Sequence, residues 1–301
     1  MTPKVSVVIP AYNAAPFIEK TLDSVAAQTY RDFELVVTDD GSSDGTAEVV
    51  DAYLKRSGLA GRCVRQENKK IAAARNTAMR AALAPFIALL DHDDLWRPDK
   101  LSVVMAEFSR SPEAGLICHN EDIVKEGRLL RTSKNGPGGP DLYERLLFGG
   151  NALSPSASVF RKDLALSIGG FRENPEFNTV EDYDFWMRLS RVTPFVFLDQ
   201  VLGEYQVVER AASRRVQYHH ASLEALLRDH LKSYFGDRPG LLATLRARRR
   251  LSAVYRSALG ALMENREAPD LRKDYAVKML RECPLEPKNL TRALQWLIRR
   301  P

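Results

Sequence analysis

The sequence predicts an α/β fold, in which a doubly wound, mostly parallel β-sheet is flanked by helices and followed by a helical C-terminal extension. Apolar, β-branched runs alternate with segments whose apolar residues recur at helical spacing through the first hundred residues. Turn residues separate these segments, and from about Gln217 onward the pattern is helical throughout. Such alternation is typical of a parallel sheet with helices on both faces.

The N-terminal elements follow this alternation in order. "KVSVVIP" is a buried strand that ends at Pro10, and Asn13 is placed to cap a helix whose apolar positions begin at Phe17. "FELVVTDD" is a second strand, and "GSSDGT" is the turn into a second helix. The pattern then predicts a third strand around "RCVRQE", a third helix at "IAAARNTAMRAAL" and a fourth strand at "FIALL".

The second half is less regular. "GLICHNEDIVK" reads as a strand, residues 133–141 as a loop rich in Gly and Pro, and "SASVFRKDLALSIGGF" as a strand that leads into a helix. "TVEDYDFWMRLSRV" predicts a helix that buries Phe185, Trp186 and Leu189. We therefore expect one α/β domain over residues 1–215 and a basic helical extension over residues 216–301.

Composition narrows the class of protein. With 301 residues, 45% hydrophobic and 28% charged, the chain has the composition of a soluble globular protein. It contains no apolar run long enough to span a bilayer, and its first residues lack the pattern of a signal peptide, so we expect a cytoplasmic protein. Cys63, Cys118 and Cys283 are far apart and odd in number, which favours reduced thiols.

Acidic residues stand at the ends of two predicted strands. Asp39 and Asp40 follow the second strand, and Asp91 and Asp93 follow the fourth. Because open parallel sheets bind ligands beyond the carboxyl ends of their strands, we expect both pairs to meet at one edge of the sheet.

The stretch "IALLDHDD" leads a buried strand directly into three carboxylates, those of Asp91, Asp93 and Asp94. These carboxylates repel one another once they are close, so a cation, or a ligand that brings one, is the expected partner. Strand alternation turns His92 away from its two aspartate neighbours. A cluster of N-capping residues ahead of "RPDKL" is the alternative interpretation.

Six segments, in this order and at these separations, resemble the family 2 glycosyltransferases of the GT-A fold: "VSVVIPAYN", "LVVTDDGSSDGT", "ENKKIAAARN", "LLDHDD", "GGF" and "VEDYDFWMRL". The resemblance covers roughly residues 3–210. It implies a GT-A catalytic domain with a mixed sheet over residues 1–215. It also implies transfer of a sugar from a nucleotide diphosphate donor, expected to be a UDP-sugar, with inversion at the anomeric carbon and usually with Mn²⁺ or Mg²⁺.

The donor site is assigned through the same resemblance. Asp91 and Asp93 match the family's D-x-D motif, so Asp93 is expected to bind the metal and Asp91 to face the ribose or the metal's water shell. Asp40 matches the aspartate that accepts a hydrogen bond from the base, and Arg75 matches a basic residue at the nucleotide. Turn formation by "DDGSSDGT" and a solvated charge at Arg75 are the structural alternatives.

Further nucleotide contacts are expected from Pro10 and Tyr12 on the same grounds. Asp182, in the family's E-D motif, is the expected general base, and Glu181 is expected near the donor or acceptor sugar. Asp94 is assigned to the sugar as well.

Alternatives and departures leave parts of the assignment open. Thr179 and Asp182 have the spacing of a capping box, which is the structural alternative for the base. Lys70 occupies a position where the family often has glycine, and Val208 replaces a histidine that many members carry. Arginines just beyond Val208 are then expected to clamp phosphate: Arg210, Arg214 and Arg215.

Three other functions compete with a sugar transferase. A degenerate member would bind a nucleotide-sugar without transferring it, and a nucleotidyltransferase would also place a metal beside a nucleotide, although its glycine-rich phosphate loop is missing here. Third, the basic run at residues 246–250 favours an anionic surface. For nucleic acid we find no aromatic residues between the basic ones. The C-terminal helices thus either rest on a membrane or pack on the catalytic domain.

Overall fold

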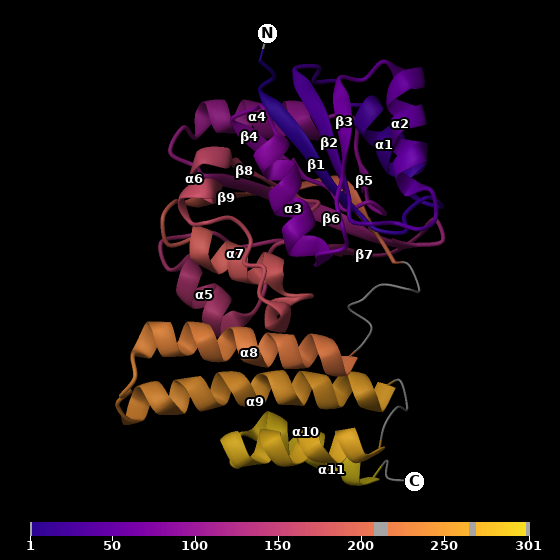
Figure 1. Ribbon diagram of the computed structural model, residues 1–301. Coiled ribbons are helices and arrows are strands. Elements are labelled where there is room, and N and C mark those ends of the chain that lie inside the picture. The colour runs from indigo at the N-terminus through magenta and orange to yellow at the C-terminus, as the bar shows by residue number, and fades with distance from the viewer. Residues whose placement is uncertain (1, 208–215, 265–268, 299–301) are drawn as a thin grey trace. The chain divides into compact units, whose positions relative to one another are not determined.

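The computed structural model describes residues 2–207, 216–264 and 269–298 (Figure 1). The chain divides into two compact units. The first comprises residues 1–173 and 181–211, and the second comprises residues 174–180 and 212–301. The boundary expected at residue 215 lies outside the described residues.

The first unit contains a nine-stranded sheet with the order β3-β2-β1-β4-β8-β6-β9-β5, in which β7 pairs with β6. β1, β2, β3 and β4 are mutually parallel, whereas β8 runs antiparallel to both β4 and β6. The sheet is therefore mixed, as expected. The strands are β1 (Val5–Ala11), β2 (Phe33–Asp39), β3 (Gly61–Arg65), β4 (Phe86–Leu89), β5 (Leu95–Trp96), β6 (Leu116–Lys125), β7 (Arg128–Ser133), β8 (Ser158–Arg161) and β9 (Phe195–Gln206).

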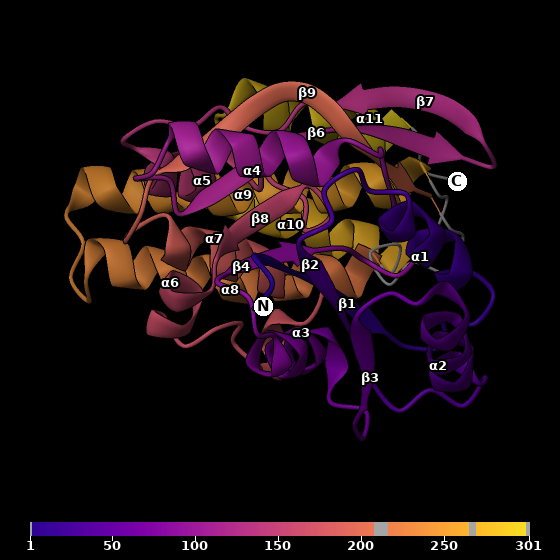
Figure 2. The ribbon, with the colours of Figure 1, turned by 90° about the horizontal axis from the view of Figure 1, so that it is seen from above.

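Helices cover both faces of the parallel part of this sheet (Figure 2). Alternate side chains of β1, including Val5, Val7 and Ile9, join one apolar cluster with residues of α1, α2 and α4, while α3 packs on β1 and β2. The helices are α1 (Ile18–Ala26), α2 (Thr46–Ser57), α3 (Lys70–Ala81), α4 (Lys100–Arg110), α5 (Leu142–Gly149), α6 (Lys162–Ser167) and α7 (Glu181–Leu189). The doubly wound arrangement is confirmed.

The prediction that Asn13 caps the first helix is wrong. α1 begins at Ile18, and no side chain caps it. Asn13 instead adopts φ +50°, and its side-chain oxygen accepts a hydrogen bond from the Ser43 backbone N–H at 3.0 Å. The Asn13 side chain therefore bonds the loop after β2, and not the start of α1 as its position in the sequence predicts.

The second unit is helical, as expected for residues 216–301. It consists of the short 3₁₀ helix η1 (Pro175–Phe177), α8 (Val216–Phe235), α9 (Leu241–Glu264), α10 (Pro269–Glu282) and α11 (Pro287–Ile298). η1 packs on α8, and α9 packs on both α8 and α10. Within the described ranges, no helix is both long enough and apolar enough to cross a bilayer.

Candidate functional site

The carboxyl ends of β1, β2 and β4 lie at one edge of the sheet because these strands are parallel neighbours. The Asp40 backbone N–H donates to the Ala11 carbonyl at 2.8 Å. The His92 ring nitrogen Nδ1 lies 3.1 Å from the Pro10 carbonyl oxygen. Both acidic segments therefore flank the end of β1, which is the convergence that the sequence predicted.

Asp40 is buried directly after β2, with 3% of its surface exposed. Its Oδ1 accepts hydrogen bonds from the Gln66 side chain at 2.7 Å and from the Lys69 backbone N–H at 2.8 Å. Gly41 follows with φ +73°, and a Cβ there would lie 2.9 Å from the Asn68 backbone nitrogen. Glycine is therefore required at this position for the 66–69 loop to approach Asp40.

Arg75 links the D-x-D motif to the E-D motif. Its guanidinium is 1% exposed, donating to Asp91 Oδ1 at 2.8 Å and to Glu181 Oε1 at 2.7 Å. Burial acts to lower the pKa of Arg75, but the carboxylates of Asp91 and Glu181 outweigh it, so the pKa is raised. Burial raises the pKa of Glu181 to about 7, although Arg75 opposes this rise. The solvated-charge alternative for Arg75 is wrong.

The neighbouring residue of α3 fixes the "GGF" segment. Asn76 donates to the Phe171 carbonyl at 2.8 Å and accepts from the Phe171 N–H at 2.9 Å. The Phe171 ring centroid also lies 5.5 Å from the Arg75 guanidinium carbon.

Lys70, the first residue of α3, has φ +72°, which is the left-handed conformation that glycine adopts at low cost. The substitution therefore keeps the backbone path that a glycine would take.

Asp93 lies in a turn that follows β4, where the Asp94 N–H donates to the Asp91 carbonyl at 3.1 Å. This turn, and not strand alternation as we had expected, directs the His92 ring toward Pro10. Within the described part of the chain, no ion pair and no hydrogen bond from another residue engages the Asp93 carboxylate. Burial raises the pKa of Asp93, His92 opposes this, and Asp91 adds to the rise.

The donor set at Asp91 and Asp93 fits a divalent cation that arrives with a diphosphate. Among the residues that the structure describes, no three His, Cys, Asp or Glu side chains could hold a metal by themselves. Mg²⁺ at nucleotide sites usually takes only one or two carboxylates, and phosphate oxygens and water complete its shell. The half-exposed pair of carboxylates matches that requirement.

Asp94 belongs to a buried polar cluster, which we define as Asp94, Lys100, His119, Glu121 and Ser156. The Asp94 carboxylate accepts from the Ser156 hydroxyl at 2.6 Å and from the Gln206 N–H at 2.9 Å, and Asp94 is 2% exposed. The structure therefore does not support the predicted contact of Asp94 with a sugar, because both of its carboxylate oxygens already accept hydrogen bonds within the protein.

Ser156 connects this buried polar cluster to the D-x-D motif. Its hydroxyl accepts from the Asp91 backbone N–H at 3.0 Å, while its carbonyl accepts from Lys100 Nζ at 3.3 Å and from the Trp96 indole at 2.8 Å. Lys100 Nζ also lies 3.2 Å from the centroid of the Trp96 ring. The Asp91 backbone is therefore fixed by its hydrogen bond to Ser156, which belongs to the buried polar cluster.

Asp182 lies half-buried in the first turn of α7. Its carboxylate accepts from the Tyr183 backbone N–H at 2.7 Å and from the Asn151 side chain at 3.4 Å. Burial raises the pKa of Asp182, while Arg75 opposes the rise. The carboxylate is thus close to the Arg75 link and has acquired greater affinity for a proton.

The remaining predicted residues divide between described and undescribed parts of the chain. Pro10 is buried inside β1, which continues to Ala11 and does not end at Pro10, and Tyr12 follows the strand with 49% of its surface exposed. Val208 and the three expected phosphate clamps, Arg210, Arg214 and Arg215, lie outside the described residues.

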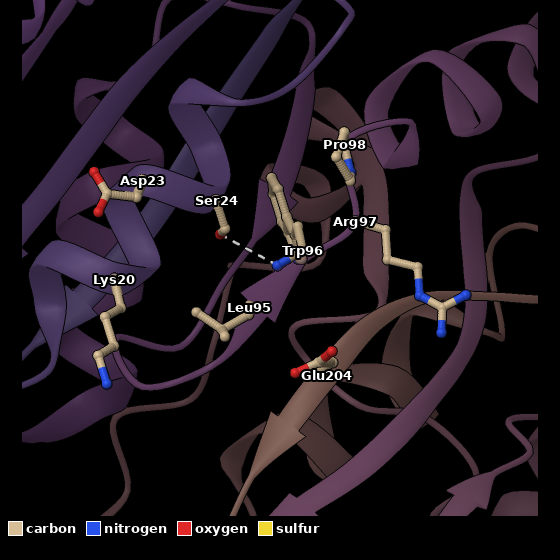
Figure 3. A pocket seen from close by; sticks show the side chains of 8 residues that line it. All are labelled: Lys20, Asp23, Ser24, Leu95, Trp96, Arg97, Pro98 and Glu204. Carbon is tan, nitrogen blue, oxygen red and sulfur yellow. Dashed lines mark hydrogen bonds between the residues drawn. The ribbon is translucent and has the colours of Figure 1, made fainter. Parts of the chain in front are cut away.

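A hollow of about 410 Å³ lies elsewhere in the first unit (Figure 3). It is formed by α1, by the segment from β5 to the start of α4, and by β9, and none of the predicted site residues lines it. Trp96 in its wall is 5% exposed and donates its backbone N–H to Ser24 at 3.2 Å. Its lining is Lys20, Asp23, Ser24, Leu95, Trp96, Arg97, Pro98 and Glu204.

Sequence reasoning missed four residues that shape the site: Gln66, Asn76, Asn151 and Ser156. Asn76 and Gln66 stand within or beside the motif "ENKKIAAARN", so their position was a usable signal. Asn151 and Ser156 lie in the loop before β8, far from every motif. Only the fold brings that loop to Asp182 and Asp91.

Comparison with known proteins finds a match to the family model described as glycosyl transferase family 2, over residues 6–169. The amylovoran biosynthesis glycosyltransferase AmsB of Erwinia amylovora is 32% identical over 219 residues, which cover 69% of this chain and 71% of AmsB. The chondroitin synthase of Escherichia coli is 29% identical over 241 residues. These cover 77% of this chain but only 34% of the synthase, so the chain spans about a third of that relative.

Solved structures share the fold. Residues 1–349 of S. aureus TarS in complex with UDP-GlcNAc match with a TM-score of 0.65 at 19% identity, covering 98% of this chain and 92% of the other. The mannosyltransferase PcManGT from Pyrobaculum calidifontis, in complex with GDP-Man and Mn²⁺, matches with a TM-score of 0.58 at 22% identity, covering 100% and 89%.

Proposed function

Because the chain belongs to glycosyl transferase family 2, we propose that it transfers a sugar from a nucleotide diphosphate donor to a hydroxyl group of a saccharide or lipid-linked acceptor. The observation that carries this proposal is the Arg75 link. One buried guanidinium joins Asp91 of the metal motif to Glu181, the residue before the expected base. Donor site and base are thereby held in one charge network.

The nucleotide is proposed to be UDP. Both hydrogen bonds to Asp40 reach Oδ1, so Oδ2 is the atom offered to the imide N–H of uracil. Tyr12 is proposed to stack on the base, and Pro10 to shape the same end of β1. TarS, which shares the fold, is described with UDP and UDP-GlcNAc, whereas the mannosyltransferase is described with GDP-Man.

The metal is proposed to be Mn²⁺ or Mg²⁺, held by Asp93 and by Asp91 or its water shell. When bound, such an ion offsets the charge that develops on the departing diphosphate. Arg75 donates to the Asp91 carboxylate and Ser156 accepts from the Asp91 backbone N–H, so both the side chain and the backbone that would hold the ion are fixed.

Asp182 is proposed as the general base of an inverting displacement. The acceptor hydroxyl attacks the face of the sugar opposite the diphosphate, and Asp182 takes its proton as the new bond forms. A raised pKa makes Asp182 a better proton acceptor than an ordinary aspartate, and Asn151 and the Tyr183 N–H orient the carboxylate. Glu181 is proposed to act through Arg75 and to lie near the sugar.

Peripheral docking on an anionic membrane is proposed for the second unit. Residues 216–301 contain seventeen Lys and Arg against nine Asp and Glu, a net charge of +8, whereas residues 1–215 carry −3. Leu290, Leu294 and Leu297 of α11 are each 51–59% exposed at helical spacing. An exposed apolar stripe beside basic residues is typical of helices that lie at a membrane interface.

Sedimentation with vesicles tests the docking proposal. We expect the protein to pellet with anionic vesicles at low salt and to be released by salt, since the attraction is partly electrostatic. Neutral vesicles and a Leu290→Ser/Leu294→Ser variant are the controls. Absence of pelleting with anionic vesicles at low salt removes the membrane from the proposal.

Donor hydrolysis tests the transferase proposal. The protein is incubated with a panel of nucleotide-sugars and with Mn²⁺, Mg²⁺ or EDTA, and the released nucleoside diphosphate is measured. Release from one donor that stops with EDTA and with Asp93→Ala supports the proposal. Calorimetric binding of UDP without turnover favours a degenerate binding protein, pyrophosphate as the product favours a nucleotidyltransferase, and failure to bind any nucleotide removes the assignments of Asp40, Asp91 and Asp93.

A further inference from the structure

We propose that the second unit positions the Asp182 base through a clip of two residue pairs, Asn178 with Tyr218 and Thr179 with His219. This inference rests on the proposed function, because it assigns the clip a role through the base. The clip residues do not touch donor or acceptor in the proposal. They act by fixing the chain that enters α7.

The clip joins two consecutive residues of one segment to two consecutive residues of another. The Asn178 side-chain amide donates to the Tyr218 hydroxyl at 2.9 Å, and the Thr179 hydroxyl lies 3.2 Å from His219 Nδ1. All four residues belong to the second unit. The segment 174–180 is thus attached to the first turns of α8, about forty residues later in the sequence.

The segment is anchored by apolar contacts on both sides of the clip. Phe177 and Val180 are each 3% exposed, and the Val180 N–H donates to the Phe177 carbonyl at 2.9 Å. Burial lowers the pKa of His219, so its ring is neutral near pH 7 and suited to a hydroxyl partner. Packing and hydrogen bonds therefore hold the same few residues.

Thr179 adopts φ +83°, a conformation that a β-branched residue rarely accepts. Such a residue persists only where its surroundings over-determine it, and residues of this kind gather at functional sites. The hydrogen bond to His219 is one of the contacts that hold Thr179 in this conformation. Without this hydrogen bond, the backbone of Thr179 can relax to a conformation of lower energy, two residues before Glu181.

The chain passes from the second unit into the first between Val180 and Glu181. Glu181 begins α7 and pairs with Arg75, and Asp182 follows in the same turn. A change of backbone angle at Thr179 is therefore transmitted to the base across only two intervening residues. A displacement of about 1 Å at a catalytic group is enough to lower a rate by roughly a hundredfold.

Hydrogen exchange of the peptide covering residues 174–189 is the first test, because it needs no donor or acceptor. In a His219→Ala/Tyr218→Phe variant, we expect exchange in this peptide to become faster, on the order of tenfold, through local opening of the start of α7. A His219→Asn variant keeps a hydrogen-bonding group near the position of Nδ1 and is expected to restore slow exchange.

Ser252→Ala is the matched control. Ser252 is a buried residue of the same unit that donates to the Met279 carbonyl at 2.8 Å and accepts from Asn289 at 2.7 Å. Its removal weakens the second unit without touching the clip. We expect faster exchange in α9–α11 and none of the change in residues 174–189.

Turnover of the donor identified by hydrolysis is the second measurement. The clip variant is expected to lower kcat by about ten- to a hundredfold while KM for the donor and Kd for UDP stay within about twofold, because the proposed donor contacts at Asp40, Asp91 and Asp93 lie outside α7. His219→Asn is expected to recover most of kcat, and Ser252→Ala to leave it unchanged.

Each other outcome overturns the inference. Unchanged exchange in residues 174–189 shows that the clip does not hold α7, whether or not a donor is known. Faster exchange with unchanged kcat reduces the clip to a structural contact, and an equal loss of kcat in Ser252→Ala assigns the effect to general destabilisation. If Asp182→Asn itself keeps full activity, it is the proposed base that fails, and the exchange result still decides whether the clip holds α7.

Discussion

Asp93 and Asp94 are neighbours in the chain, yet they belong to two regions with opposite physical character. Asp93 lies with Asp40, Asp91, Glu181 and Asp182 in what we call the carboxylate rim, and within the described part of the chain no other residue forms a hydrogen bond or an ion pair with its carboxylate. Asp94 lies in the buried polar cluster, where Ser156 and Gln206 take up both carboxylate oxygens. An aspartate side chain is thus free to bind a ligand in the carboxylate rim, whereas in the buried polar cluster both of its oxygens are already hydrogen-bonded.

The difference shows that adjacent residues of one sequence motif can have different roles, one suited to binding a ligand and the other to supporting the fold. In the carboxylate rim, the unpaired carboxylate of Asp93 costs stability and is suited to a ligand that brings a cation. In the buried polar cluster, every completed hydrogen bond fixes the backbone that presents the rim, because Ser156 bonds both Asp94 and the Asp91 N–H. Substitutions in the two regions should therefore separate activity from stability.

Asp93→Ala should have the largest effect on activity. We expect donor hydrolysis to fall by about a thousandfold, since the metal would lose a carboxylate ligand. The melting temperature should stay the same or rise, because the pKa of Asp93 is raised by burial and its charged form is disfavoured in the folded protein. Hydrolysis assays and thermal unfolding of the same preparation check both expectations. A large fall in the melting temperature of Asp93→Ala would show that Asp93 supports the fold as Asp94 does, and would contradict the division into two regions.

Arg75→Met should break the link inside the carboxylate rim. It leaves the buried Glu181 and the partly exposed Asp91 without their cation, which should lower the free energy of unfolding by about 3 kcal/mol. Denaturant unfolding checks the stability, and donor hydrolysis should be lost as well. Arg56→Met is the control, because Arg56 forms an exposed ion pair with Glu19. A small effect of Arg75→Met would mean that the link is not what holds the rim together.

Glu121 should make the buried polar cluster sensitive to pH. Burial raises its pKa from 4.5 to about 7, so between these values the folded state binds more protons than the unfolded state. Stability from this group is therefore present at pH 5 and lost as the pH rises toward 7, by about 2 kcal/mol. Glu121→Gln should flatten that part of the stability profile. Equal slopes for both proteins, measured by denaturant unfolding from pH 5 to 8, would contradict the expectation.

Asp94→Asn should have the smallest effect, about 1 kcal/mol or less of unfolding free energy. Burial, followed by Glu121 and Asp93, raises the pKa of Asp94 well above its ordinary value, so a neutral amide resembles the form that the site favours. Its oxygen can accept from the Gln206 N–H, and its amide can donate to the Ser156 hydroxyl. Donor hydrolysis should stay within about tenfold, whereas Asp93→Asn should abolish it. Equal losses in the two variants would show that both aspartates bind the ligand.

Much of the fold could be predicted because the responsible signals are local. Strands β1, β2 and β4 follow from short apolar runs, and α7 from the helical spacing of Phe185, Trp186 and Leu189, all of which are fully buried. Carboxylates at strand ends could be placed at one edge of the sheet because parallel neighbours end on the same side. Local signals failed at Asn13, where a partner in another loop replaced the helix cap.

The sequence by itself determined the α/β class, the helical extension and the residues of the carboxylate rim, because periodicity and motif spacing are properties of the chain. Only the tertiary structure decided which aspartate is buried, that Arg75 joins Asp91 to Glu181, and that Ser156 supports the D-x-D motif. Those outcomes depend on burial and on partners up to 112 residues apart in the sequence. No local pattern encodes them, since the same carboxylate acquires a different pKa and a different role from whatever the fold packs around it.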